Sequence, residues 1–248
     1  MSGYSRHVIA LLLPGVYAPQ DDTALLAEAL REEAVPAGAR VLDVGTGSGA
    51  LALAAARRGA EVTAVDVSRR AVWTARLNAL LFRLPVRIRR GDLFAPARGR
   101  SYDVILANPP YVPTPHGGRG PHGGRGPHGG RGPHGGRGPH GGQGPRGRSR
   151  AWDAGHDGRL LLDRICRDAP TLLASRGVLL IVQSALSDPG RTLELLRGAD
   201  LKAAVVRRRR LALGPVLRSR EDWLRRRGLL APHERTEELV VIRAERTR

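Results

Sequence analysis

The stretch Arg40-Val41-Leu42-Asp43-Val44-Gly45-Thr46-Gly47-Ser48-Gly49 decides the fold class of this chain. A short apolar run leads into three alternate glycines, and the alanine-rich segment 50–56 follows. Glycines at such a turn let the backbone approach a ligand closely at the N-terminus of the next helix. The stretch therefore predicts the first strand, turn and helix of a doubly wound, Rossmann-like α/β sheet.

Two classes of ligand fit this turn. Gly45, Gly47 and Ala50 satisfy the dinucleotide pattern G-x-G-x-x-G/A, so an NAD-binding protein is one interpretation. Asp43 lies inside the strand, two residues before the first glycine, where its negative charge would repel a pyrophosphate. The same charge suits a ligand with a cationic amino-acid part or a sulfonium, which is the interpretation that we favour.

Acidic residues end the next two predicted strands. Asp66 closes the strand 61–66, where its carboxylate could accept hydrogen bonds from both hydroxyls of a ribose. Asp92 follows the alternating strand 86–89 and Gly91, and it could face the exocyclic amine of an adenine ring. The alternative for Asp92 is an ordinary turn residue after a glycine.

The fourth predicted strand, 104–107, ends in Asn108-Pro109-Pro110-Tyr111. Neither proline can donate a hydrogen bond to a neighbouring strand, so the strand must stop there. The Asn108 side-chain oxygen and the Pro109 carbonyl are two acceptors that suit one NH2 group, and Tyr111 offers a flat face to a planar group. We interpret the turn as a site for methylation of a planar nitrogen; a plain strand-ending turn is the alternative.

Before the glycine turn, the segment 16–35 predicts a helix with one apolar stripe. Asp21, Asp22 and Thr23 are each plausible N-caps of that helix, and they could instead line a ligand pocket.

The composition indicates a globular chain with an excess of positive charge. Of 248 residues 41% are hydrophobic, and the formal net charge is +18, with Lys202 the single lysine among 41 basic residues. This arginine bias allows a contact with RNA or the ribosome without requiring one. One cysteine, Cys166, excludes an internal disulfide and a cysteine-based metal site, and the apolar run 8–13 is too short for a signal peptide. We expect a soluble cytoplasmic protein without a metal.

Residues 115–144 are five copies of the hexapeptide Pro-His-Gly-Gly-Arg-Gly, with Gln143 in place of arginine in the last copy. The segment has no apolar side chain with which to offset the entropy of ordering, so we expect a disordered insert after the fourth strand. The remaining residues of 1–248 are expected to form a single domain.

After the insert, the pattern predicts a helix from Leu160 to Leu172, strands at 177–183, 203–206 and 238–242, and helices at 188–198 and 217–227. Arg207 to Arg210 follow the sixth strand. They are interpreted either as a solvated strand end or as a contact for phosphate or an acidic protein surface.

This order of seven strands, with the glycine turn first and N-P-P-Y after the fourth, resembles a class I S-adenosylmethionine-dependent methyltransferase. Within that superfamily, V-Y-x-P-x-D-D-T at 16–23, N-P-P-Y-V-x-T-P at 108–115 and A-W-x-x-G-x-x-G-R at 151–159 resemble the HemK-like release-factor glutamine methyltransferases. The likeness is greatest to their short eukaryotic and archaeal branch. The family's acidic residue after Val-Tyr is Ala18 here.

The resemblance implies S-adenosylmethionine as the methyl donor. It implies donor contacts by Thr23, Asp43, Gly45, Gly47, Asp66, Asp92, Leu93 and Asn108, and binding of the target amide by Asn108, Pro109, Pro110, Tyr111 and Val112. Asn108 to Tyr111 would carry the reaction. Eukaryotic and archaeal relatives work with a small zinc-binding partner, whereas the motifs of this chain leave an activator subunit open.

We therefore predict an N-methyltransferase acting on a planar amide nitrogen, most simply a glutamine of a protein such as a peptide chain release factor. The main alternative is methylation of an exocyclic amine in RNA or DNA, for which an evident target-recognition domain is missing. A non-enzymatic or NAD-binding Rossmann protein is the second alternative.

Overall fold

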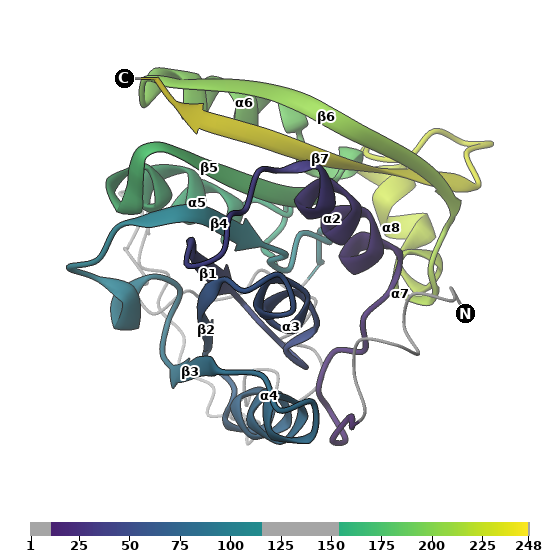
Figure 1. Cartoon of the computed structure of the whole chain (residues 1–248). Coiled ribbons are helices and arrows are strands. Elements are labelled where there is room, and N and C mark those ends of the chain that lie inside the picture. The colour runs from purple at the N-terminus through teal and green to yellow at the C-terminus, as the bar shows by residue number, and fades with distance from the viewer. Residues whose placement is uncertain (1–10, 116–153, 248) are drawn as a thin grey trace, which may run out of the picture.

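The computed structural model describes residues 11–115 and 154–247 (Figure 1). Helices and strands alternate along most of the chain. In order they are α2 Asp21–Glu32, β1 Arg40–Val44, α3 Ala50–Ala56, β2 Glu61–Asp66, α4 Arg69–Leu81, β3 Val86–Arg90, η1 Ala95–Ala97, β4 Tyr102–Ala107, α5 Leu162–Asp168, η3 Ala169–Leu172, β5 Leu173–Ser184, η4 Ala185–Ser187, α6 Pro189–Gly198, β6 Leu201–Ala212, α7 Pro215–Ser219, α8 Glu221–Arg226 and β7 Thr236–Arg246.

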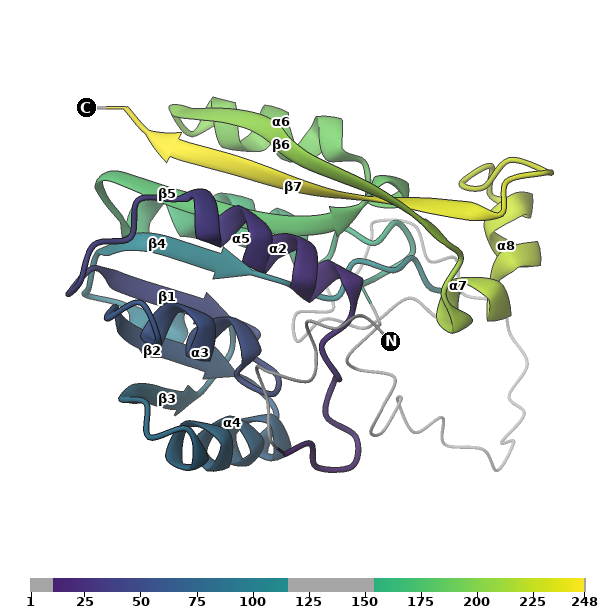
Figure 2. The same cartoon turned by 45° about the vertical axis from the view of Figure 1, so that its right-hand side comes forward.

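The strands form one seven-stranded sheet in the order β3-β2-β1-β4-β5-β7-β6. Strands β1 to β5 pair in parallel, whereas β7 is antiparallel to both β5 and β6. Helices α2 and α3 pack against each other on one face of the sheet, and α5 and α6 on the other (Figure 2). The predicted seven-stranded α/β fold is confirmed.

The central strands are buried on both faces, which explains their continuous apolar sequences. Leu42 of β1, Ile105 and Leu106 of β4, and Leu179 and Leu180 of β5 have no exposed surface. Because parallel strands all end at one edge, the residues that follow β1, β2, β3 and β4 come together there.

All seven strands were predicted, but two helices differ from expectation. The helix expected at 160–172 is α5 followed by the 3-10 helix η3, in which Pro170 lacks the N–H that would continue α-helical bonding. The basic helix expected at 217–227 is two short helices, α7 and α8, that meet at Arg220.

The interpretation of Arg207 to Arg210 as a strand end was wrong, whereas an outward contact stays a prediction for Arg208 and Arg210, whose side chains are exposed. Strand β6 continues through all four arginines to Ala212, and their side chains alternate between its two faces. Arg209 forms an ion pair with Glu28 of α2 at 2.8 Å, and Arg207 pairs with Glu32 one helical turn further on. Neighbouring side chains therefore neutralise the inward-facing arginines.

The predicted N-caps of the first helix were also wrong. Helix α2 begins at Asp21, its N-cap is Gln20, and no side chain makes a capping hydrogen bond there. Asp22 and Thr23 lie in the first turn, and both are buried with exposed fractions of 4%. These two side chains face the site described below.

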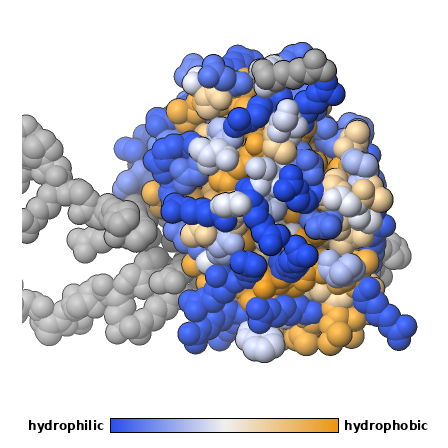
Figure 3. All heavy atoms as spheres, turned by 60° about the vertical axis from the view of Figure 1, so that its left-hand side comes forward, coloured by the Kyte–Doolittle hydropathy of each residue, from blue (hydrophilic) through white to orange (hydrophobic). Residues whose placement is uncertain are grey.

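Hydrophilic side chains predominate on the face in Figure 3, with apolar side chains between them. Among the described residues, none of the helices combines the length and apolar character that crossing a membrane requires.

The described chain stops at Pro115 and resumes at Ala154, and the backbone joins the two ends. The N–H of Thr114 donates to the carbonyl of Gly155 at 2.9 Å. Apart from Pro115, the predicted insert 115–144 lies outside the described residues, as do Ala151 and Trp152 of the third motif. The described residues on either side of this gap therefore lie side by side.

Shortening the insert should leave the fold intact. We expect the free energy of unfolding, measured in urea, of a variant without residues 121–144 to lie within about 1 kcal/mol of the value for the full chain. The reason is that loop-closure entropy changes slowly with loop length. A loss of several kcal/mol would show instead that the repeats pack on the domain.

Candidate active site

A cavity of about 770 Å³ lies at the carboxyl ends of β1, β2, β3 and β4. The segment that leads into α2, the glycine turn after β1 and the turn after β4 contribute to its wall. Of the residues predicted to bind the donor or the acceptor, the cavity is lined by Thr23, Gly45, Gly47, Asp66, Asp92, Leu93, Asn108, Pro109, Pro110, Tyr111 and Val112. Asp43 does not line it.

The glycine turn has the backbone conformation that its sequence predicts. Gly45, Gly47 and Gly49 have φ values of +75°, +55° and +89°. Residues that have a Cβ adopt such φ values only at a cost in free energy. The N–H of Gly47 donates to the Asp66 carboxylate at 2.9 Å, which ties the turn to the end of β2. Burial raises the pKa of Asp66 above its usual value.

Asp43 holds the turn from inside the protein. Its side chain is 1% exposed, and Oδ2 accepts hydrogen bonds from the Thr46 hydroxyl at 2.6 Å and the Ala52 N–H at 3.1 Å. Oδ1 has no hydrogen-bond partner among the described residues. Burial raises the pKa of this carboxyl to about 6. Asp43 therefore stabilises the glycine turn from the protein side and does not line the cavity. Its predicted contact with the ligand stays a prediction.

Asp92 lies at the rim of the cavity. Its Oδ2 accepts from Arg164 of α5 at 2.7 Å, and half of its side chain is exposed. Its neighbour Leu93 has a φ of +46°, in the left-handed region that is unfavourable for leucine.

The turn after β4 is anchored to helix α2 by two side chains. The Asn108 amide donates from Nδ2 to the Thr23 hydroxyl at 3.2 Å. The Tyr111 hydroxyl donates to Asp22 Oδ2 at 3.0 Å. Because the nitrogen of Asn108 is engaged with Thr23, the opposite amide oxygen is the atom available as an acceptor.

Asp22 and Tyr17 belong to this cluster. The alternative that Asp22 and Thr23 line a pocket is confirmed, whereas the contacts of Asp22 with Tyr17 and Tyr111 were not predicted. Tyr17 also donates to Asp22 Oδ2, at 2.7 Å, so one carboxylate receives two phenolic hydroxyls. Burial, together with the charge of Asp22, holds the pKa of both Tyr17 and Tyr111 well above the usual value. The motif V-Y-x-P-x-D-D-T contains both residues, and the contact with Tyr111 is what gives them a place in the site.

Glu237 of β7 is a further ionisable group near this cluster. Burial, followed by the negative charge of Asp22, raises its pKa to about 7. Nothing in the motifs indicated this residue, because it is distant from them in sequence and precedes the strand predicted at 238–242.

Comparison with known proteins identifies the family. The family model for the methyltransferase small domain matches residues 8–116. A protein of Methanocaldococcus jannaschii named "Putative protein N5-glutamine methyltransferase MJ0928" is 31% identical over 195 residues, which are 78% of this chain and 85% of that protein. The chain belongs to the HemK-like glutamine methyltransferase family. This confirms the predicted family and its class I, S-adenosylmethionine-dependent type.

Two further proteins are similar to this chain. The release factor glutamine methyltransferase of Moorella thermoacetica is 42% identical over 41% of this chain, which spans only 38% of that enzyme's length. A chain in the structure of the E. cuniculi Mtq2-Trm112 complex, described as responsible for methylation of the translation termination factor eRF1, is 21% identical to this one. Its TM-score is 0.60, with 94% of this chain and 99% of that chain covered, so it shares the fold.

The raised pKa values predict an unusual dependence of stability on pH. Asp43 and Glu237 have folded pKa values of about 6 and about 7, above the ordinary values of 3.8 and 4.5. The folded protein therefore binds more protons than the unfolded chain in this range, and its free energy of unfolding should rise by about 1–3 kcal/mol as the pH falls from 8 to 5.

Urea unfolding across this pH range checks the prediction, with Glu237→Gln as the matched variant. The variant should lose Glu237's share of the rise, which begins as the pH falls through about 7 and continues toward 4.5. A wild-type protein that loses stability steadily from pH 8 to 5 would contradict the assignment.

Proposed function

We propose that this methyltransferase transfers a methyl group to the side-chain amide nitrogen of a glutamine in a protein substrate. The observation that carries the proposal is the turn after β4, where Asn108 is fixed by Thr23 and Tyr111 by Asp22. A rigid pair of acceptors at this turn selects a planar NH2 group over a hydroxyl or a thiol.

The cavity fits the donor that the family uses. Asp66 stands beside the glycine turn, where a ribose would find a carboxylate, and the left-handed glycines leave room for close approach. Asp92 and Leu93 would flank the adenine, and Asp43 would act on the donor indirectly by holding the turn. When bound, S-adenosylmethionine supplies a methyl group on a sulfonium, which is an electrophile that needs no further activation.

We infer a direct in-line displacement at this site. Asn108 Oδ1 and the Pro109 carbonyl would accept the two N–H bonds of the target amide, which aims the nitrogen electron pair at the methyl carbon. The new N–C bond forms as the C–S bond breaks, the bonding pair stays on sulfur, and the nitrogen then releases one proton. Most of the rate would come from this positioning.

The names of the relatives favour a release factor as the substrate. Both the Moorella enzyme and the E. cuniculi complex are described as acting on termination factors. On the same basis we propose a partner subunit in the role that Trm112 has beside Mtq2, and a cytoplasmic site of action, where translation terminates.

Labelling a host lysate that lacks the gene tests the substrate class. Purified protein and methyl-labelled S-adenosylmethionine should place label on protein, released by protease and recovered as methylglutamine. Label released by nuclease would overturn the glutamine assignment in favour of an exocyclic amine in nucleic acid.

Asn108→Ala should abolish most of the activity. We expect kcat to fall about 100-fold or more, because the variant loses an acceptor that positions the reacting nitrogen. Thr23→Val, which keeps Asn108 but removes its anchor, should give a smaller loss. Initial rates and donor affinity by calorimetry check both variants, and full activity of Asn108→Ala would refute the role.

A further inference from the structure

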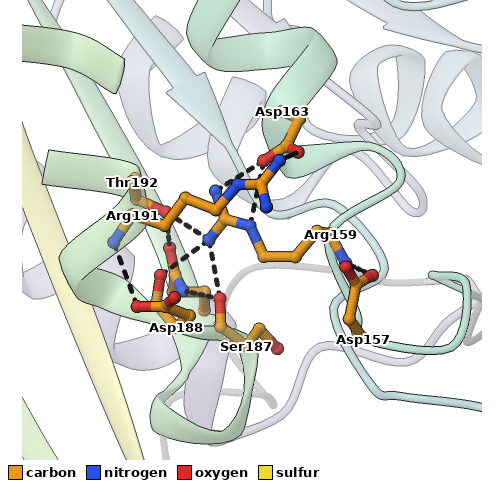
Figure 4. A network of polar contacts seen from close by, with 8 residues as sticks. Asp157, Arg159, Asp163, Ser187, Asp188, Arg191 and Thr192 are labelled. Atoms are coloured by element: carbon orange, nitrogen blue, oxygen red, sulfur yellow. Dashed lines mark hydrogen bonds and ion pairs between the residues drawn. The ribbon is translucent and has the colours of Figure 1, made fainter. Parts of the chain in front are cut away.

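Arg159 is a buried cation held by a dense set of hydrogen bonds (Figure 4). These bonds connect it, through Ser187, to the turn after β4, residues 108–111, which we call the acceptor turn. Its side chain is 3% exposed and pairs with Asp163 of α5, which accepts from Nε at 2.9 Å and Nη2 at 2.7 Å. The guanidinium thus donates from two nitrogens to the single oxygen Oδ1, a forked contact that the one ammonium nitrogen of lysine cannot make.

The remaining nitrogen, Nη1, fixes the segment between β5 and α6. It donates to the carbonyl of Ser187 at 2.6 Å, the carbonyl of Asp188 at 2.8 Å and the hydroxyl of Thr192 at 2.6 Å. The Ser187 carbonyl also accepts from the Gln183 side chain at 2.9 Å. Ser187 therefore has its backbone set by two side chains, both of which are buried.

Ser187 passes this order on to the acceptor turn. Its hydroxyl donates to the backbone carbonyl of Tyr111 at 2.5 Å, and Ser187 has no exposed surface. Gly158 makes the approach possible, because a Cβ there would lie 2.3 Å from the Tyr111 carbonyl oxygen and 2.7 Å from Ser187 Oγ. A larger residue at position 158 would push these two groups apart.

We infer that Arg159 and Ser187 are positioning residues for the methyl transfer. Tyr111 is held at its hydroxyl by Asp22 and at its carbonyl by Ser187, so the peptide plane between Tyr111 and Val112 has one orientation. That orientation sets where the Pro109 and Asn108 acceptors stand relative to the donor. The inference rests on the proposed function of the acceptor turn. It assigns this turn a second support, from Ser187, in addition to the contacts from α2.

A positioning role differs from a purely stabilising one in what it changes. The Ser187 hydroxyl lies on the acceptor side, whereas the glycine turn and Asp66 hold the donor side. Loss of the hydroxyl should therefore lower kcat for the acceptor and leave donor affinity unchanged. A generally weakened fold would lower melting temperature and affect both substrates.

Ser187→Ala tests this directly, with Thr74→Val as the matched control. Thr74 is also fully buried and donates one hydrogen bond, to the Arg70 carbonyl in helix α4. We expect Ser187→Ala to lower kcat about tenfold or more with donor affinity within about twofold, while Thr74→Val keeps wild-type kcat. Arg159→Lys should share the kcat defect, since lysine cannot reproduce the fork.

Hydrogen exchange gives a readout that needs no acceptor. The amides of Val112 and Thr114 should exchange faster in Ser187→Ala than in wild type, and at the wild-type rate in Thr74→Val. Unchanged exchange together with wild-type kcat would overturn the positioning role, whatever Arg159→Lys does. Wild-type protein that never methylates glutamine would instead overturn the proposed function.

Discussion

The carboxylate of Asp22 is the contact on which the acceptor half of this site depends. One oxygen receives the hydroxyls of Tyr17 and Tyr111, and the other lies within hydrogen-bond distance of the Thr23 hydroxyl, which in turn accepts from Asn108. A buried carboxylate needs such donors, because burial without them costs several kcal/mol. The need to satisfy Asp22 therefore fixes helix α2 against the turn after β4, and the site cannot form without the helix.

The sequence predicted the parts of this molecule whose residues are neighbours along the chain. Apolar runs gave the seven strands, alternate glycines gave the first turn, and two prolines ended β4 before Tyr111. In each case the physical cause is local, since φ preferences and hydrophobic periodicity act over a few residues. The residues that line the cavity were predictable for the same reason, because they follow strands whose carboxyl ends meet at one edge.

What could not be predicted depends on partners far apart in sequence. For Asp22 both a helix cap and a pocket residue were open until Tyr111 supplied a second donor. Arg207 and Arg209 looked like part of a solvated or outward-facing basic run until α2 supplied Glu32 and Glu28. Asp43 illustrates the same limit at short range. The pattern located it beside the ligand, but the side-chain direction within β1 turns it toward Thr46 and Ala52, behind the turn.

Different elements hold the donor half and the acceptor half of the site, and this difference affects substrate selection. The donor half is made by β1, β2 and the turns after them, which hold one another through Gly47 and Asp66. The acceptor half draws on α2 and on the segment after β5, and Arg220, between α7 and α8, donates to the Pro113 carbonyl at 2.9 Å. From the second half of the chain, Ser187 and Arg220 thus contact the acceptor half, and Arg164 of α5 reaches the donor side at Asp92. Changes at Ser187 or Arg220 can therefore alter which amide enters while the hydrogen bond from Gly47 to Asp66 keeps the donor half in place.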